Sequence, residues 1–109
     1  MFKKVNRLSK KEFEEFYKIG KKSHFPHLII ITSPSPTTKT AVGVGKKVSK
    51  SAVRRNTLRR RVNAVLYKTL ANSEVGVVII ILKPTFNPLA RKAAEEFVQQ
   101  SIAEVVKSA

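Results

Sequence analysis

The sequence contains no cysteine, so disulfides, thiolate metal sites and cysteine nucleophiles are excluded. Its two histidines do not by themselves supply the ligands of a structural zinc site. No apolar run approaches the roughly 20 residues that span a bilayer, and the first residues, MFKKVNRLSKKEFEEF, lack an apolar core of signal-peptide length. We therefore expect a cytoplasmic protein without a membrane partner.

Acidic residues are also scarce. Seven Asp or Glu stand against 22 Lys or Arg, which gives the 109-residue chain a formal net charge of +15. Self-repulsion on this scale opposes compaction unless an anionic partner screens it, so a polyanion is the first partner to consider. The apolar fraction of 42% is ordinary for a folded protein, and the length suits one domain, residues 1–109, with a single modest core.

Residues 9–20 predict a short helix. Ser9 and Glu12 form a capping-box pattern, and Gly20 is placed to end the helix in a left-handed turn. Several apolar side chains fall on one side of this helix, and burial against a sheet is their simplest interpretation. The apolar surface comes from Leu8, Phe13, Phe16, Tyr17 and Ile19.

Two strands are expected next. Residues 28–32 form a β-branched run that Pro34 and Pro36 close with a loop. Residues 40–48 alternate more weakly, with Val42 and Val44 on one face, which also takes Lys46 if the strand extends that far. Gly43 and Gly45 leave the other face without side chains, which indicates either close approach of a backbone or ligand or a bulge.

A helical period begins near Ser51 and continues to about Leu70. Its apolar residues gather within roughly a quarter turn when each residue advances by about 100°; they are Leu58, Val62, Val65, Leu66 and Thr69. Polar residues lie opposite, namely Asn56, Arg60, Asn63 and Tyr67, and Arg54, Arg59 and Arg61 flank the apolar stripe. Packing of that stripe on a core therefore decides where the basic side chains point.

The remaining pattern completes the fold. After a turn at residues 71–74, VGVVIIILKP predicts a central strand covered on both faces. Pro84 and Pro88 bracket a loop, and a last helix follows with the buried stripe Leu89, Ala93, Phe97, Ile102 and Val105 or Val106. The order α-β-β(-β)-α-β-α gives a single-domain α+β sandwich in which helices cover a sheet.

The segment KKVSKSAVRRNTLRRRV, residues 46–62, holds eight Lys or Arg and no acid. No acidic residue lies between Thr40 and Leu70, so local neutralising partners are missing. Arginine forks match phosphate oxygens, and bound phosphates would relieve the unfavourable placement of cations at a helix N-terminus. We therefore expect contact with nucleic acid. RNA is favoured over DNA because a strand, and not the first helix of a helix-turn-helix, precedes the basic helix.

These residues also carry a family resemblance. A Gly-bearing strand, KKV, then AV, a spacer and RN followed by a hydrophobic and two basic residues resembles the signature of the bacterial ribonuclease P protein subunit. The N-terminal RL, the aromatic residues ahead of Gly20 and the apolar strand ending in KP are similar to the same family, so the resemblance covers nearly the whole chain. It implies a protein that helps a catalytic RNA remove the 5′ leader from precursor tRNA. It also implies a left-handed crossover in the sandwich, against the usual hand.

The resemblance further implies site residues. The catalytic RNA would contact Lys46, Lys47, Arg55, Asn56, Arg59 and Arg60, to which the charge pattern of the helix adds Arg54 and Arg61. A cleft for the single-stranded leader would include Arg7, Phe13 and Tyr17. Three departures from the family pattern stand out. Thr57 replaces an arginine, the spacing around Lys50 and Ser51 is one residue longer, and the first helix is one residue shorter, with Ile31 where a tyrosine is frequent. We expect weaker leader affinity as a result.

Protein side chains offer no evident catalytic group. The seven carboxylates lie in the two outer helices and one turn, without His or Cys beside them, whereas a metal-dependent nuclease needs convergent carboxylates. Hydrolysis is thus assigned to the RNA, with Mg²⁺ bound mainly there, and no DNA partner is expected. The alternatives are a ribosomal or other structural RNA-binding protein, a DNA-binding regulator and, last, an autonomous nuclease.

Overall fold

The structure is a computed structural model that describes residues 8–34, 39–70 and 76–108. Its elements run in the order α1 (Lys10–Ile19), β1 (Lys21–His24), β2 (Leu28–Ser33), β3 (Lys39–Gly43), α2 (Ala52–Leu70), β4 (Val77–Leu82), the 3-10 turn η2 (Pro84–Phe86) and α3 (Arg91–Ser108). The predicted α+β sandwich and its element order are confirmed. None of the helices in these ranges has the length and apolar content needed to cross a membrane.

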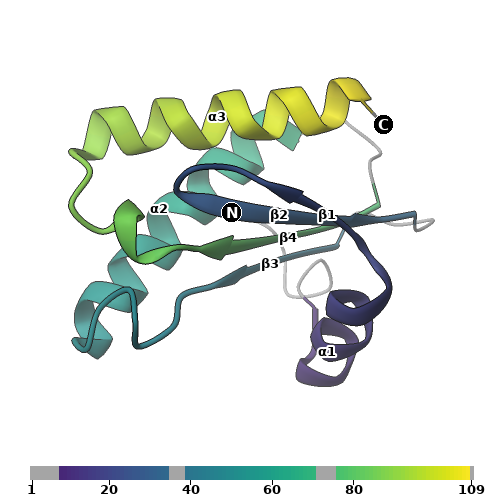
Figure 1. Cartoon of the computed structure of the whole chain (residues 1–109), viewed down its shortest axis with the longest axis horizontal. Coiled ribbons are helices and arrows are strands. Elements are labelled where there is room, and N and C mark those ends of the chain that lie inside the picture. Colours follow the sequence, from purple (N-terminus) through teal and green to yellow (C-terminus); the bar gives the residue numbers. More distant parts are fainter. Residues whose placement is uncertain (1–7, 35–38, 71–75, 109) are drawn as a thin grey trace.

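The strands form one sheet in the order β1-β2-β4-β3, shown in Figure 1. β2 pairs antiparallel with β1 and with β4, whereas β3 pairs parallel with β4. The apolar β4 is therefore a central strand, as predicted, and α2 is the crossover that joins two parallel neighbours. The left hand that the resemblance implies for this crossover stays a prediction.

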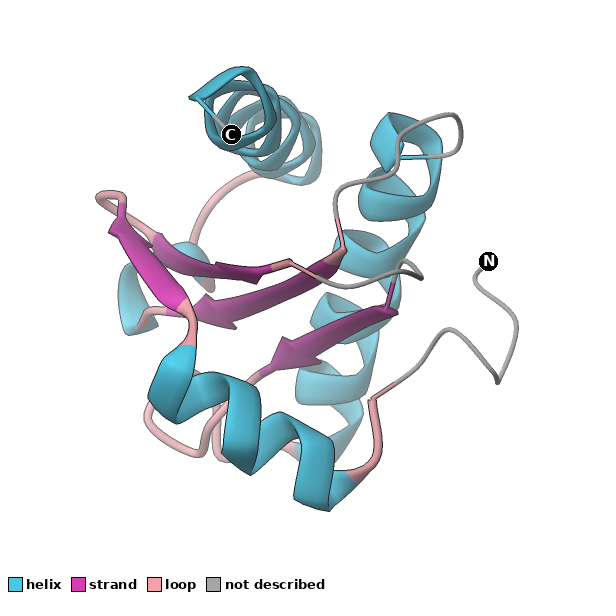
Figure 2. Cartoon of the chain, turned by 90° about the vertical axis from the view of Figure 1, so that its right-hand side faces the viewer, coloured by secondary structure: helices cyan, strands magenta, loops and turns pink. Residues whose placement is uncertain are grey.

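Helices cover the two faces of the sheet unequally. Figure 2 shows α3 above the sheet and α1 below it, and α2 packs with α3 into the same core. Successive residues of β4 point to opposite faces: Val78 and Ile80 enter the α2–α3 core, and Val77 and Ile79 enter the smaller cluster beneath α1. The expectation that this strand is covered on both faces is therefore correct.

Helix α2 is built around its apolar stripe. Leu58, Val62 and Leu66 are at most 2% exposed, and they pack on the sheet and on α3. On the opposite side Asn56 and Arg60 are exposed. The 3.6-residue period of the sequence thus gave the direction of the basic side chains correctly.

The buried stripe of α3 differs by one residue from the prediction. Ala94, Val98 and Ile102 are buried, whereas Ala93 is exposed and Phe97 is half-buried. Leu89 precedes the helix, because the chain from Pro84 first forms η2 and buries Phe86. Ile102 is buried as predicted, and Leu89, Phe97 and Val105 pack partly on the same core, so the prediction is wrong only for Ala93, in whose place Ala94 is buried. The side chain of Val106 lies outside the described residues.

The predicted end of α1 is wrong in conformation. Gly20 has φ −69° and ψ 154°, an extended and not a left-handed backbone, because the chain passes directly into β1. A glycine is required there for another reason: a Cβ would lie 2.7 Å from the carbonyl oxygen of Phe16 and would overlap the side chain of Ile31. The capping box of Ser9 and Glu12 is present as predicted.

The glycine-bearing strand is shorter than expected. β3 ends at Gly43, and a turn follows in which the Val48 N–H donates to the Gly45 carbonyl at 3.0 Å. The pairing of β3 with β4 is regular, so Gly43 marks no bulge; a Cβ there would lie 2.9 Å from Cδ1 of Ile81. Val42 and Val44 are buried as predicted. The predicted turn at residues 71–74 lies outside the described residues.

Candidate nucleic-acid interface

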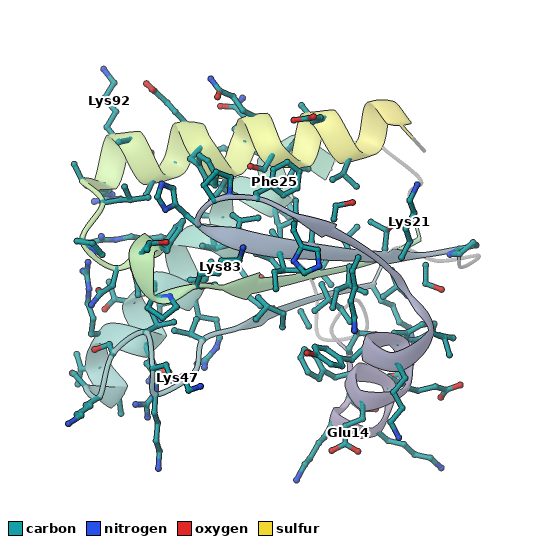
Figure 3. All side chains as sticks on the ribbon, in the orientation of Figure 1. Glu14, Lys21, Phe25, Lys47, Lys83 and Lys92 are labelled. Atoms are coloured by element: carbon teal, nitrogen blue, oxygen red, sulfur yellow. The ribbon has the colours of Figure 1, made fainter. Side chains whose placement is uncertain are left out.

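The basic residues of the segment 46–62 come together at the N-terminal end of α2. Lys46 and Lys47 are exposed in the turn after β3, and α2 begins a few residues later at Ala52. Figure 3 shows Lys47 projecting from this loop away from the sheet. We call Lys46 and Lys47 together with the polar residues of the first three turns of α2 the basic surface; the latter are Arg54, Arg55, Asn56, Arg59, Arg60 and Arg61.

Two of these arginines are anchored by neutral acceptors. Arg54 donates from Nε to Oδ1 of Asn87 at 2.9 Å and from Nη2 to the Asn87 carbonyl at 3.0 Å. Arg55 donates from Nη1 to the carbonyls of Ser49 and Lys50 at 3.0 and 3.1 Å. Because none of these acceptors is ionised, the hydrogen bonds hold the guanidinium groups in place without cancelling their charge.

The next turn carries three arginines with different surroundings. Arg59 donates to Oδ1 of Asn56 at 2.7 Å, Arg60 is exposed, and Arg61 is half-buried on the side facing α3. Among the described residues, no carboxylate forms an ion pair with a guanidinium of α2; the carboxylates of Glu12 and Glu95 pair with Lys39 and Arg91. The positive charge of the basic surface is therefore available to an external anion.

Local hydrogen bonding starts α2 without an acid. The Ser51 hydroxyl accepts from the Arg54 N–H at 3.2 Å, and the Ser49 hydroxyl accepts from the Ser51 N–H at 3.2 Å. No acidic residue lies in the first turn of α2 to offset the positive end of the helix dipole. The dipole therefore adds to the positive charge of the arginines. A phosphate group placed here would be favoured by both.

A second candidate surface lies on α1. Phe13 is half-buried, and its ring stacks on that of Tyr17 with centroids 6.2 Å apart and planes inclined by 24°. Phe13 and Phe16 pack only partly against the sheet, whereas Tyr17 is 43% exposed and Ile19 66% exposed. Simple burial is therefore wrong for Tyr17, and Phe13 and Tyr17 have the partial exposure that a place in a leader cleft implies. Tyr17 and Ile19 remain exposed because only one narrow side of α1 contacts the sheet.

Lys22 was not anticipated as part of this surface. Its Nζ lies 4.5 Å from the ring centroid of Tyr17, within the range of a cation–π contact. The contact depends on β1, where Lys22 pairs with Ile31 and points to the face that carries α1. Only recognition of KKSH as a strand could have predicted this contact, and that segment has no alternating apolar pattern to mark it as one.

The three departures from the family pattern have plain structural settings. Thr57 is half-buried and donates from its hydroxyl to the Val53 carbonyl at 3.0 Å, so it serves the helix backbone where a cation would otherwise project. Ile31 is 1% exposed and belongs to the cluster under α1. Lys50 and Ser51 lie just ahead of α2, while Arg7 is outside the described residues.

Carboxylates do not converge on either surface. Within residues 8–34, 39–70 and 76–108, no three His, Cys, Asp or Glu side chains lie close enough to hold a metal ion. Glu12 and Glu95 serve in ion pairs, and Glu14 projects from α1 away from the sheet in Figure 3. The arrangement of the described side chains suits binding of a polyanion and supplies no cluster for metal-assisted hydrolysis.

Comparisons with known proteins agree with these observations. A sequence model of the family described as Ribonuclease P matches residues 2–108. The Ribonuclease P protein component of Microcystis aeruginosa is 35% identical, with 73% of each chain covered. That of Pseudanabaena sp. is also 35% identical and covers 78% of this chain and 77% of its own.

Solved structures show the same fold at lower identity. A mutant RNase P protein from Staphylococcus aureus superposes with a TM-score of 0.80 at 19% identity, covering 93% of this chain and 90% of that chain. The RNase P protein from Thermotoga maritima gives a TM-score of 0.72 at 18% identity, covering 86% and 96%. The sequence matches along almost the whole chain and the shared α+β sandwich lead to one conclusion: this chain belongs to the ribonuclease P protein family.

Proposed function

We propose that the chain is the protein subunit of the endoribonuclease ribonuclease P, that its basic surface docks on the catalytic RNA, and that α1 contacts the 5′ leader of precursor tRNA. One observation carries the RNA contact. The core-facing stripe sets the direction of the arginines of α2, and neutral acceptors hold the guanidinium groups of Arg54 and Arg55, yet none of the α2 guanidinium groups pairs with a carboxylate among the described residues. Such a surface gains most from an external polyanion.

The protein's part in the reaction is binding and positioning. Its cations neutralise phosphates, which lowers the repulsion that opposes folding of the RNA and approach of the substrate. Ribonuclease P catalysis depends on metal ions, and we assign Mg²⁺ to the RNA because phosphate oxygens are ligands that this ion prefers. A cytoplasmic location is part of the same proposal.

The leader contact explains how substrate is told from product. The ring of Tyr17 and the ammonium group of Lys22 offer a stacking surface and a charge for a single-stranded segment. Mature tRNA has lost that segment, so the contact is made by precursor tRNA alone. Phe13→Ala is accordingly expected to weaken binding of precursor tRNA more than binding of mature tRNA.

Reconstitution tests the proposal directly. The protein is combined with the catalytic RNA of the same organism, and leader removal from precursor tRNA is followed at low Mg²⁺. Arg59→Ala and Arg60→Ala are expected to weaken assembly and to lower the log–log salt slope by about one unit for each lost phosphate contact. Lys92→Ala is the matched control, because Lys92 is an exposed cation of α3 that projects on the side away from Lys47 in Figure 3.

The competing functions predict other outcomes. A ribosomal or structural RNA-binding protein would co-purify with ribosomal RNA and would not stimulate leader removal. A DNA-binding regulator would bind duplex DNA more tightly than precursor tRNA, and an autonomous nuclease would cleave without RNA. Absence of both binding to the catalytic RNA and stimulation of cleavage would refute the proposed function.

A further inference from the structure

Helix α1 is held to the sheet by few contacts. None of its side chains is buried, and only Phe13 and Phe16, with Leu8 just before it, pack partly on the small cluster below the sheet. Its C-terminal end is fixed because the chain continues through Gly20 into β1, where the Gly20 backbone lies close to Ile31. Among the described residues no helix or strand precedes α1, and its N-terminal end is held by non-covalent contacts.

An ion pair supplies the restraint at the N-terminal end. Nζ of Lys39 lies 2.6 Å from Oε2 of Glu12, and Oε1 of the same carboxylate accepts from the Ser9 N–H at 3.1 Å. Lys39 is the first residue of β3, and the neighbouring Thr40 carbonyl accepts from the Leu8 N–H at 3.2 Å. Two adjacent residues of β3 therefore tie the start of α1 to the edge of the sheet.

The pair is partly shielded from solvent. The side chains of Lys39 and Glu12 are 28% and 33% exposed, which is less than the 70% and 44% of the other ion pair, Arg91 with Glu95. The hydrogen bond from Lys39 lowers the pKa of Glu12, with a further contribution from the Ser9 N–H. The carboxylate is thus kept ionised and neutralised at the same time.

The Glu12–Lys39 pair lies next to the stacked aromatic residues of α1, Phe13 and Tyr17. Glu12 precedes Phe13 in the chain, and the Phe13 ring lies over Gly43, 3.8 Å from where a Cβ would stand. Phe13 in turn stacks on Tyr17. A shift at Glu12 would move both rings, and an unpaired carboxylate beside them would repel the phosphates of a bound strand.

We propose that the Glu12–Lys39 ion pair positions α1 for leader binding, and that Lys39 acts through Glu12 instead of contacting phosphate itself. The inference rests on the proposed function, because it assigns α1 to the leader. In a chain with 22 basic residues, one lysine would then hold and neutralise a carboxylate on α1, the helix proposed to contact the leader.

The test uses the reconstituted holoenzyme and four variants. Glu12→Gln removes the charge of the carboxylate, Lys39→Met leaves that carboxylate unpaired, Lys39→Arg keeps the pair, and the double variant Glu12→Gln/Lys39→Met removes both charges. Dissociation constants are measured for precursor tRNA and for mature tRNA, and melting temperatures are recorded for each protein. Glu14→Gln is the control for loss of an exposed negative charge on the same helix.

The proposal predicts a specific order of effects. Glu12→Gln is expected to weaken binding of precursor tRNA about threefold, the scale set by measured exposed ion pairs. Lys39→Met should weaken it more, about fivefold, because an unpaired carboxylate then faces the leader. Neither variant should change binding of mature tRNA, Lys39→Arg should match the wild type, and the double variant should lose less than the two single losses combined.

Other results overturn the inference. Tighter binding of precursor tRNA by Glu12→Gln, together with a salt slope lowered by about one unit in Lys39→Met, would make Lys39 a phosphate contact. Equal losses for precursor and mature tRNA, or a fall in melting temperature alone, would make the pair a plain stabilising contact. If the wild-type holoenzyme itself bound precursor and mature tRNA equally, the proposed leader contact would fail first and the inference with it.

Discussion

The two faces of the sheet differ in how many side chains they bury. Among the described residues, fifteen buried side chains form the cluster that the sheet shares with α2 and α3, whereas three form the cluster beneath α1. The first face has the close packing that holds a small domain together. The second leaves Phe13 half-buried and Tyr17 exposed, which is the condition a surface needs if it is to meet a partner.

The charged side chains of the two faces also have different roles. On α2 the apolar stripe faces the core and most of the arginines face outward, so one helix both packs on the core and carries the proposed RNA-binding surface. On α1 the only ion pair between elements that the described residues form, Lys39 with Glu12, takes the place of a buried apolar side. Buried stabilising contacts are therefore concentrated on the α2–α3 face, and substitutions on the two faces should have different consequences.

The largest expected effect comes from the α2–α3 face. Ile80 is fully buried in β4, and Ile80→Ala should lower the free energy of unfolding by about 2–5 kcal/mol through lost burial and a residual cavity. Phe13→Ala on the other face removes more atoms but should lower it less, because the ring is half-buried. Urea unfolding of both proteins measures the difference, and equal losses would contradict the contrast between the faces.

The next effect concerns the junction of α1 and β1. Gly20→Ala should lower the free energy of unfolding by about 1–3 kcal/mol, because the new Cβ meets the Phe16 carbonyl and Ile31. Gly45→Ala is the matched control: no atom lies within 4 Å of the corresponding Cβ position, and a small gain in stability is expected. A neutral Gly20→Ala would show that the junction adjusts freely, and α1 would then need another explanation for its position.

Sequence periodicity predicted the well-buried face better than the open one. The stripe of Leu58, Val62 and Leu66 and the central strand β4 were recognised because burial imposes a repeating apolar pattern. β1 was not assigned, because KKSH has no such pattern and owes its strand conformation to pairing with β2. Tertiary contact also explains why residue 20 is a glycine, because its neighbour Ile31 on β2 cannot be inferred from the local sequence.

The candidate site shows the same limit. The basic residues around α2 could be predicted because they are close in sequence and share a helix. The anchoring of Arg54 by Asn87 joins residues 33 positions apart, and the pair of Lys39 with Glu12 joins residues 27 apart. Such partners are set by the topology of the sheet, so they became visible only in the structure.

A smaller effect separates two arginines of the basic surface. Arg54→Ala should lower the free energy of unfolding by about 1–2 kcal/mol, because it removes two hydrogen bonds to Asn87 and leaves that residue's oxygens unpaired. Arg60→Ala should change it by less than about 0.5 kcal/mol, since its side chain is exposed. Thermal unfolding gives both values, and a large loss for Arg60→Ala would mean that its charge is needed within the protein.

The smallest expected effect is the pH dependence of the link between α1 and β3. Its hydrogen bonds lower the pKa of Glu12 in the folded protein, so the stabilisation is complete above the unfolded value of about 4.3 and is lost as the pH falls through the folded value. The urea midpoint of Glu12→Gln should therefore lie below that of the wild type at about pH 7 and pH 5.5 and converge with it in stronger acid.

Glu14→Gln provides the comparison, because it removes an exposed carboxylate from the same helix. Its urea midpoint should follow that of the wild type from neutral pH into acid. If the gap between Glu12→Gln and the wild type stayed constant at every pH, the carboxylate charge would not be what holds α1 to β3. The attachment would then come from the Leu8–Thr40 hydrogen bond and the packing of Phe16, and α1 would need no lysine to keep its place.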